Sequence, residues 1–87
     1  MATSLPAKCQ ADFCIVPVGT VSPSTSPHLD RVEILLKQSG LEYSMHQSGT
    51  RIEGDWLEVM NLIGKAHMLL HDESVQKVHT DVRIETR

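Results

Sequence analysis

Residues that could do chemistry gather in two short stretches of this sequence. In the first, Gly49 to Trp56, Glu53 ends a short strand-like segment, and Asp55 with Glu58 fits a capping box at a helix start. The second, Gly19 to Pro27, is a loop dense in hydroxyl groups. A carboxylate beside several hydroxyls suits a small polar ligand that carries amine donors or a positive charge. The residues expected to contact such a ligand are Thr20, Ser24, Ser26, Ser48, Thr50 and Glu53.

A structural interpretation of the same residues stays open at this point. The serines would then only cap a helix or form turns, and Glu53 would make a surface ion pair. His67 and His71 lie four residues apart on one helix face, a spacing that could reach one metal ion. A third ligand is not evident, although Glu53 or Asp72 could be proposed, and we predict no metal site and no cofactor.

The sequence carries no pattern typical of a catalytic site. Cys14 falls inside an apolar segment, where burial would raise the pKa of a thiol rather than activate it. No nucleophile–base spacing, paired carboxylates or glycine-rich phosphate loop is present. We therefore expect a binding protein rather than an enzyme; a small hydrolase or metal-dependent enzyme is the less favoured alternative.

Composition excludes several classes of protein. The chain of 87 residues is long enough for one domain, and its net charge is −3 with basic residues unclustered. Aromatic residues are few (Phe13, Tyr43 and Trp56), so nucleic-acid binding is not expected. No apolar run reaches the roughly 18–20 residues of a membrane span. No secretory signal and no disulfide framework are evident, which predicts a cytoplasmic protein with reduced thiols.

The order of the expected elements predicts the fold. Residues 1–10 read as a flexible tail, and residues 11–87 as a single domain. Hydrophobic periodicity predicts strands at 11–18, 41–47, 50–53 and 78–85, and helices at 27–39 and 56–72. This βαββαβ order is typical of the ferredoxin-like α+β fold, a two-layer sandwich in which two helices cover one face of an antiparallel four-stranded sheet.

Three local expectations follow from this fold. The first and third strands would be central neighbours, so the hydroxyl-rich loop and residues 48–53 would form one pocket. The continuous apolar run from Ala11 to Val18 predicts a strand buried on both faces, by helices on one side and by a second copy on the other. Gly64, inside the second helix, suggests a close backbone contact there.

Several segments are similar to one family. They are Ile15–Thr20, Ser22–Ser26, Gly49–Gly54, Glu58–Met60, Ala66–His67 and Lys77–Ile84. Together they resemble the small thiamine-binding proteins, also described as hydroxymethylpyrimidine-binding or YkoF-like, over residues 14 to 87.

The resemblance implies a ligand and an assembly. It implies that thiamine (vitamin B1) or its hydroxymethylpyrimidine moiety is bound without turnover, and that the protein is a homotetramer built as a dimer of dimers. Glu53 would accept a hydrogen bond from the exocyclic amine of the pyrimidine. Thr20, Thr50 and the loop serines would reach the ring nitrogens. The alternative function is an oligomeric structural or regulatory protein whose pocket is empty or binds an anion.

Overall fold

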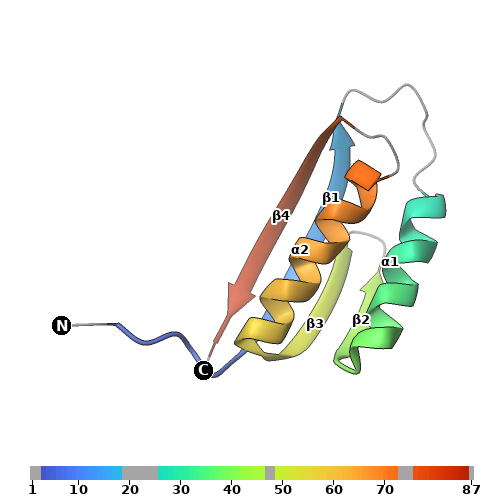
Figure 1. Cartoon of the computed structure of the whole chain (residues 1–87). Helices are drawn as coiled ribbons and strands as arrows, with labels where there is room; N and C mark the ends of the chain where they lie inside the picture. Colours follow the sequence, from blue (N-terminus) through green and yellow to red (C-terminus); the bar gives the residue numbers. More distant parts are fainter. Residues whose placement is uncertain (1–2, 19–25, 47–48, 73–75, 87) are drawn as a thin grey trace.

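The computed structural model describes residues 3–18, 26–46, 49–72 and 76–86, with only the backbone placed for 26–29 and 72. The described elements are β1 (Lys8–Val18), α1 (Ser26–Ser39), β2 (Glu42–His46), β3 (Gly49–Asp55), α2 (Trp56–Asp72) and β4 (Lys77–Glu85). These strands form an antiparallel sheet in the order β2-β3-β1-β4, and both helices lie on the same face of it (Figure 1). The predicted ferredoxin-like α+β fold is confirmed.

The register of the sheet decides which side chains face the helices. Phe13 on β1 lies opposite Thr50 on β3 and Val82 on β4, and the neighbouring Asp12 lies opposite Arg51 and Arg83. Residues opposite each other share a face, and successive residues alternate between faces. Since Phe13 is buried and Asp12 is half-buried, the odd-numbered residues of β1 face the helices. The even-numbered residues point to the other side, which we call the open face.

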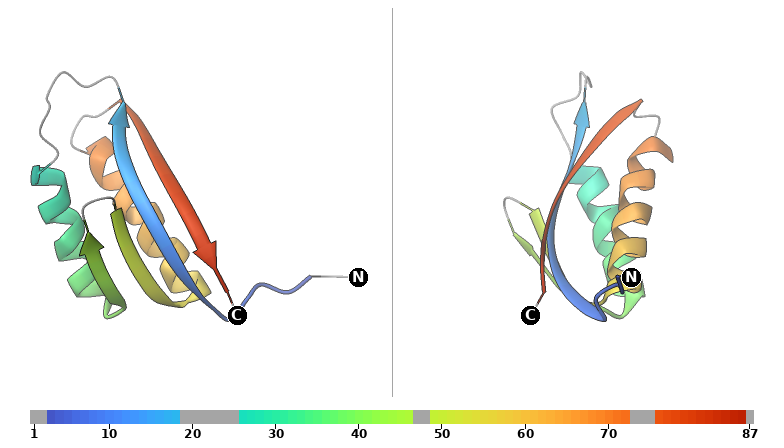
Figure 2. Two further views of the ribbon diagram at one scale, coloured as in Figure 1. Left: turned by 180° about the vertical axis from the view of Figure 1, so that it is seen from behind. Right: turned by 90° about the vertical axis from the view of Figure 1, so that its left-hand side faces the viewer.

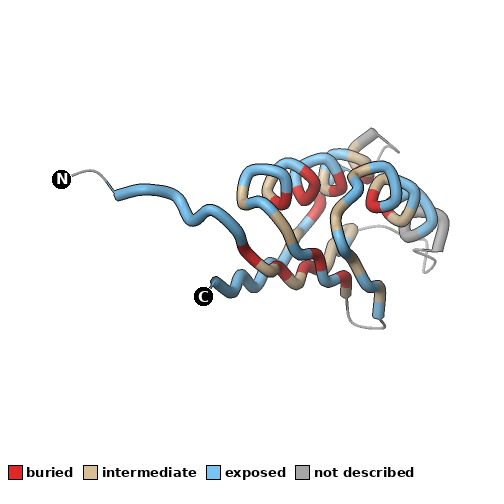
Figure 3. Tube along the Cα trace, turned by 90° about the horizontal axis from the view of Figure 1, so that it is seen from below, coloured by how far each residue is buried: buried red, intermediate tan, exposed pale blue. Residues whose placement is uncertain are grey.

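The core lies between the sheet and the two helices. Apolar residues from β1, β3, α1 and α2 meet there, and four of them are almost fully buried: Leu36, Ile52, Val59 and Leu70. Seen from below, the buried segments of sheet and helices face one another, while the outer surfaces are exposed (Figure 3). The spacing of apolar residues along α2 matches this one-sided burial, with Val59, Ile63, Ala66 and Leu70 facing the sheet, as predicted.

Local contacts fix the ends of the elements. The Ser39 hydroxyl donates to the Leu36 carbonyl (2.6 Å) and accepts from the Leu41 amide (3.1 Å) at the end of α1. Gly40 follows with a φ of 76°, the left-handed conformation expected of a glycine that ends a helix. At the start of α2, the Trp56 amide donates to the Ala7 carbonyl (3.0 Å) and ties the segment before β1 to the domain.

The predicted tail, residues 1–10, overlaps β1. Lys8, Cys9 and Gln10 pair with the last three residues of β3, and Cys9 is buried. No sequence pattern indicates this extension, because Cys9 is the only apolar residue among the three. The extension comes from pairing with β3, which itself runs on to Asp55.

Two further expectations concern β1 and α2. The helix side of the run from Ala11 to Val18 is covered in the single chain, whereas on the other side Asp12 and Cys14 are half-buried and Val16 is 40% exposed, so its burial by a second copy stays a prediction. The expected close contact at Gly64 is wrong: the residue is exposed, and a Cβ built there would meet no atom within 4 Å outside the adjacent helix backbone. Its cost to the helix is therefore not offset by packing.

Candidate functional site

A shallow hollow of about 370 Å³ lies on the open face of the sheet. Its lining comes from β1, β2 and β4: Asp12, Phe13, Cys14, His46, Asp81, Val82 and Arg83. Most of these residues have side chains that can donate, accept or carry charge. The volume is near the lower end of the roughly 300–1,000 Å³ that small-molecule sites occupy.

Asp12 is the centre of the polar cluster in this hollow. One of its carboxylate oxygens lies 3.0 Å from His46 Nε2, and the other lies 3.6 Å from an Arg51 guanidinium nitrogen. Arg83 lies opposite Asp12 on β4. The side chains of Asp12, His46 and Arg51 are 35–54% exposed, so water screens their charges. Each Asp12 oxygen thus faces a different basic side chain.

Gly49 is on the strand that lies between His46 and Asp12. The two residues are on strands that are not neighbours, since β3 lies between β2 and β1. His46 lies opposite Gly49, and a Cβ at position 49 would come within 2.7 Å of the Phe13 backbone oxygen. A side chain there would have to push β3 and β1 apart. The close approach of β3 and β1 therefore depends on this glycine.

The structure separates two predicted ligand residues that the sequence had placed together. Glu53 is exposed on the open face, between Gln10 on β1 and Glu42 on β2, and it does not line the hollow. Thr50 is only 4% exposed and faces the helices between Phe13 and Met45. Residues 50 and 53 are three apart on one strand, so they point to opposite faces. A ligand on the open face cannot contact both.

The structure says little about the four other residues that were predicted to contact the ligand. Thr20, Ser24 and Ser48 lie outside the described residues. Ser26 is the first residue of α1, with its backbone placed and its side chain not described. The expected joining of the hydroxyl-rich loop to residues 48–53 therefore stays a prediction.

The residues of the hollow were missed at the sequence level, although one signal was present. Asp12 is a lone carboxylate at the start of the apolar run that forms the central strand. A charged residue on a central strand must face the open side, and the β2-β3-β1-β4 order then places β3 and β4 on either side of it, with β2 one strand further away. His46, Asp81 and Arg83 could have been found only from this register.

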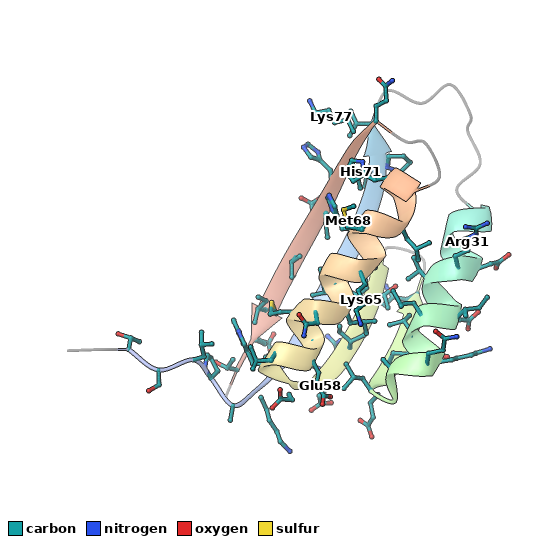
Figure 4. The ribbon with its side chains drawn as sticks, viewed as in Figure 1. Arg31, Glu58, Lys65, Met68, His71 and Lys77 are labelled. Atoms are coloured by element: carbon teal, nitrogen blue, oxygen red, sulfur yellow. The ribbon has the colours of Figure 1, made fainter. Side chains whose placement is uncertain are left out.

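A second hollow, of about 380 Å³, separates the end of α1 from the first half of α2. It is lined by Leu35, Gln38, Ser39, Leu41, Glu58, Asn61, Leu62 and Lys65, and Figure 4 marks Glu58 and Lys65 on its α2 side. Its charged groups are at the ends of long, flexible side chains, which no ion pair holds in place within the described part of the chain. The open-face hollow is the better organised of the two.

The two histidines of α2 contact each other and the neighbouring strand. The His67 and His71 rings are 5.4 Å apart between centroids, and His67 Nδ1 lies 2.6 Å from the Thr80 hydroxyl oxygen on β4. Within the described residues, no three histidine, cysteine or acidic side chains are grouped as metal ligands would be. His67 thus links α2 to β4.

The two cysteines are on opposite faces of β1 and are not disulfide-bonded. Cys9 is buried, and burial together with the nearby Asp55 raises the pKa of its thiol. Cys14 is half-buried and lines the open-face hollow. Neither of the described helices combines the length and the apolar character that crossing a membrane would require.

Fold and site together define a ferredoxin-like α+β domain with a small polar hollow on its uncovered sheet face. Residues 11–87 match the family model described as thiamine-binding protein, so the chain belongs to this family. The resemblance noted in the sequence is confirmed.

A curated relative and two solved structures are similar to this chain. The chain is 45% identical over 76 residues to a UPF0045 protein, ECM15, of Eremothecium gossypii, covering 87% of this chain and 72% of the relative. A domain of unknown function from Bacillus cereus superposes with a TM-score of 0.81 at 21% identity, covering 93% and 77% of the two chains. A proposed thiamine biosynthesis or salvage protein from Thermotoga maritima superposes with a TM-score of 0.76 at 19% identity, covering 92% and 84%. At these identities the two structures support the fold alone.

Proposed function

We propose that this protein binds thiamine or its hydroxymethylpyrimidine moiety in the open-face hollow, without turning it over. The observation that carries the proposal is the cluster in which Asp12 lies 3.0 Å from His46 and 3.6 Å from Arg51, beside a hollow of suitable volume. Membership of the thiamine-binding protein family supports the choice of ligand.

The charges of the hollow fit an aminopyrimidine that is joined to a cationic thiazolium ring. Asp12 already accepts a hydrogen bond from His46 and faces Arg51, whereas Asp81 has no ion pair among the described residues. Asp81 is therefore the acceptor that we assign to the exocyclic amine. His46 and Arg83 can donate to the ring nitrogens or a hydroxyl group. The two carboxylates suit the positive charge of a thiazolium ring.

An anion-binding protein is the second candidate function. Arg51 and Arg83 both flank Asp12, so a phosphate or sulfate could lie between the guanidinium groups. The carboxylates of Asp12 and Asp81 in the same hollow oppose such an ion, which is why we favour the cation.

We further propose that the protein acts in the cytoplasm as a homo-oligomer, a dimer of dimers. The two free thiols support a reducing compartment. The partly exposed apolar residues of β1 and β4, Val16, Val82 and Ile84, support association with a further chain.

The first test is calorimetry with thiamine and with hydroxymethylpyrimidine. Saturable binding is expected, weakened by about tenfold or more in Asp81→Asn, since hydrogen bonds to charged groups contribute about 1.5–3 kcal/mol. Glu53→Gln is the matched control: this carboxylate is on the same face but outside the hollow, so binding should not change. Absence of heat with both ligands, together with thermal stabilisation by sulfate, would favour the anion-binding alternative.

Alkylation of the cysteines locates the ligand independently. Iodoacetamide should react with Cys14 first, because Cys9 is buried and its raised pKa lowers the fraction of thiolate. Saturating thiamine should slow the modification of Cys14 and leave that of Cys9 unchanged, as followed by mass spectrometry. An unprotected Cys14 at saturation would place the ligand outside the hollow.

A further inference from the structure

The helix side of the domain carries a pair of histidines that the open-face hollow does not use. His67 and His71 are near the end of α2, both are half-buried, and their ring centroids are 5.4 Å apart. Residues four apart share one face of a helix, so both imidazoles can reach a common point. The hollow is on the other side of the sheet, and it includes neither residue. The pair is therefore a separate feature of the molecule.

The spacing of the two rings suits a shared metal ion. Two imidazoles bound to one tetrahedral Zn²⁺ ion, with Zn–N bonds of about 2.0–2.1 Å, have ring centroids roughly 5 Å apart. The observed separation of 5.4 Å is close to this value. The helix backbone thus already sets the two rings at the distance that one ion between them requires.

Thr80 on β4 contacts the ring of His67 at its other nitrogen. His67 Nδ1 lies 2.6 Å from the Thr80 hydroxyl oxygen, and both views in Figure 2 show the end of α2 beside the start of β4. When Nδ1–H donates to this oxygen, Nε2 carries the lone pair that a metal ion needs. Histidines that bind metals nearly always donate their other ring N–H to a fixed acceptor, and Thr80 supplies one.

The end of α2 also favours a positive charge. His71 is in the last turn of the helix, and Figure 4 shows it where α2 ends near the start of β4. The carbonyl groups of a last helical turn have no amide partners within the helix, which gives this end a partial negative charge. A cation held by His67 and His71 is stabilised by that charge.

We propose that His67 and His71 together bind one Zn²⁺ or similar divalent transition-metal ion, with Thr80 as the positioning residue for His67. Imidazole nitrogens suit Zn²⁺, Cu²⁺ and Ni²⁺, whereas Mg²⁺ and Ca²⁺ prefer oxygen ligands. His67 binds through Nε2. His71 binds through one ring nitrogen and can keep a hydrogen-bond partner on the other. Both side chains are half-buried, so water completes the coordination of the ion.

Two protein ligands define a weak and exchangeable site. Within the described residues no third histidine, cysteine or acidic side chain joins the pair, and Glu53 points to the open face, away from α2. With half the protein ligands of a structural zinc site, the dissociation constant should be on the order of 1–100 µM. An ion at this site connects the last two turns of α2 and stabilises the folded chain more strongly as its concentration rises.

The first test is calorimetry of the full chain with ZnCl₂ and with MgCl₂. Saturable binding is expected for Zn²⁺ alone, and His71→Ala should bind Zn²⁺ at least about tenfold more weakly, since one imidazole of the pair is lost. His79→Ala is the matched control: it removes an exposed histidine on the open face of β4, and Zn²⁺ affinity should not change. Absence of saturable Zn²⁺ binding up to about 1 mM, far above the expected range, would overturn the proposal. So would an unchanged affinity in His71→Ala.

A pair of Thr80 variants separates positioning of His67 from mere packing. Thr80→Val removes the acceptor and should weaken Zn²⁺ binding about tenfold, whereas Thr80→Ser keeps the hydroxyl and should bind as the natural chain does. Equal affinities in the two variants would contradict the role assigned to Thr80.

Nuclear magnetic resonance of the natural chain locates the ion without any substitution. In long-range ¹H–¹⁵N spectra of the histidine rings, Zn²⁺ should shift Nε2 of His67 and one nitrogen of His71, and Nδ1 of His67 should stay protonated. Shifts confined to other histidines would place the ion elsewhere and overturn the proposal.

Discussion

The two faces of this sheet are made from alternate residues of the same strands, yet they are built on different physical principles. The helix side is packed with apolar groups and encloses one polar side chain among the described residues, that of Thr50. The open side carries charged residues from all four strands, including Asp12, Arg51 and Arg83. A single residue step along β1, from Asp12 to Phe13, passes from one environment to the other.

The comparison shows how a domain of this size can separate stability from recognition. Burial of apolar surface stabilises the fold and is confined to the helix side. Exposed charges on the open side contribute little to stability because water screens them. Residues such as Asp81 and Arg83 are thus available for a ligand or for a second copy without weakening the core. Substitutions on the two faces should therefore have separate effects.

The largest expected difference is between two adjacent residues of β3. Ile52→Ala should lower the free energy of unfolding by about 2–5 kcal/mol, since the side chain is 0% exposed and its loss leaves a cavity. Arg51→Ala, one residue away on the open face, should cost less than about 1 kcal/mol, because its contact with Asp12 is long and exposed.

Urea denaturation followed by circular dichroism measures both values. Equal losses for the two variants would show that the open-face cluster stabilises the fold as much as the core does. The separation of roles between the two faces would then be incorrect.

The fold could be predicted well because periodicity and helix-end signals are local. The apolar spacing of α2 and the Ser39–Gly40 helix end each report directly on one element. The candidate site depends on which residues meet across strands. Asp12, His46 and Arg83 are far apart in sequence and are brought together by a register that no local pattern contains. Sequence patterns could therefore indicate a polar site at this sheet, but not the residues that line the open-face hollow.

Two glycines, Gly49 in the sheet and Gly64 on the outer surface of α2, give a test with an expected effect of intermediate size. Gly49→Ala should destabilise the protein by about 1–3 kcal/mol, because its Cβ would lie 2.7 Å from the Phe13 backbone oxygen. Gly64→Ala is the matched control on the outer surface of α2, where nothing outside the adjacent helix backbone is within 4 Å of the added Cβ. It should stabilise the helix by about 1 kcal/mol. Thermal denaturation of both variants measures the two opposite shifts.

Gly49→Ala carries a second expected result. If the strands separate to admit the methyl group, His46 no longer reaches Asp12, and thiamine binding should weaken together with stability. A Gly49→Ala protein as stable as the natural chain would show that β1 and β3 do not need this close approach. Gly49 would then not constrain the arrangement of the strands at the open face.

The smallest expected effect is that of Thr50→Val, and it is the most informative about ligand position. Thr50 was predicted to bind the ligand, but its hydroxyl is buried on the helix side and has no hydrogen-bond partner among the described residues. Replacing an unpaired buried hydroxyl by a methyl group should change stability by no more than about 1 kcal/mol, toward greater stability. Thiamine affinity should be unchanged, in contrast to Asp81→Asn. A loss of affinity in Thr50→Val would place the ligand beneath the helices, because the two side chains have nearly the same shape and the group that changes is buried on the helix side.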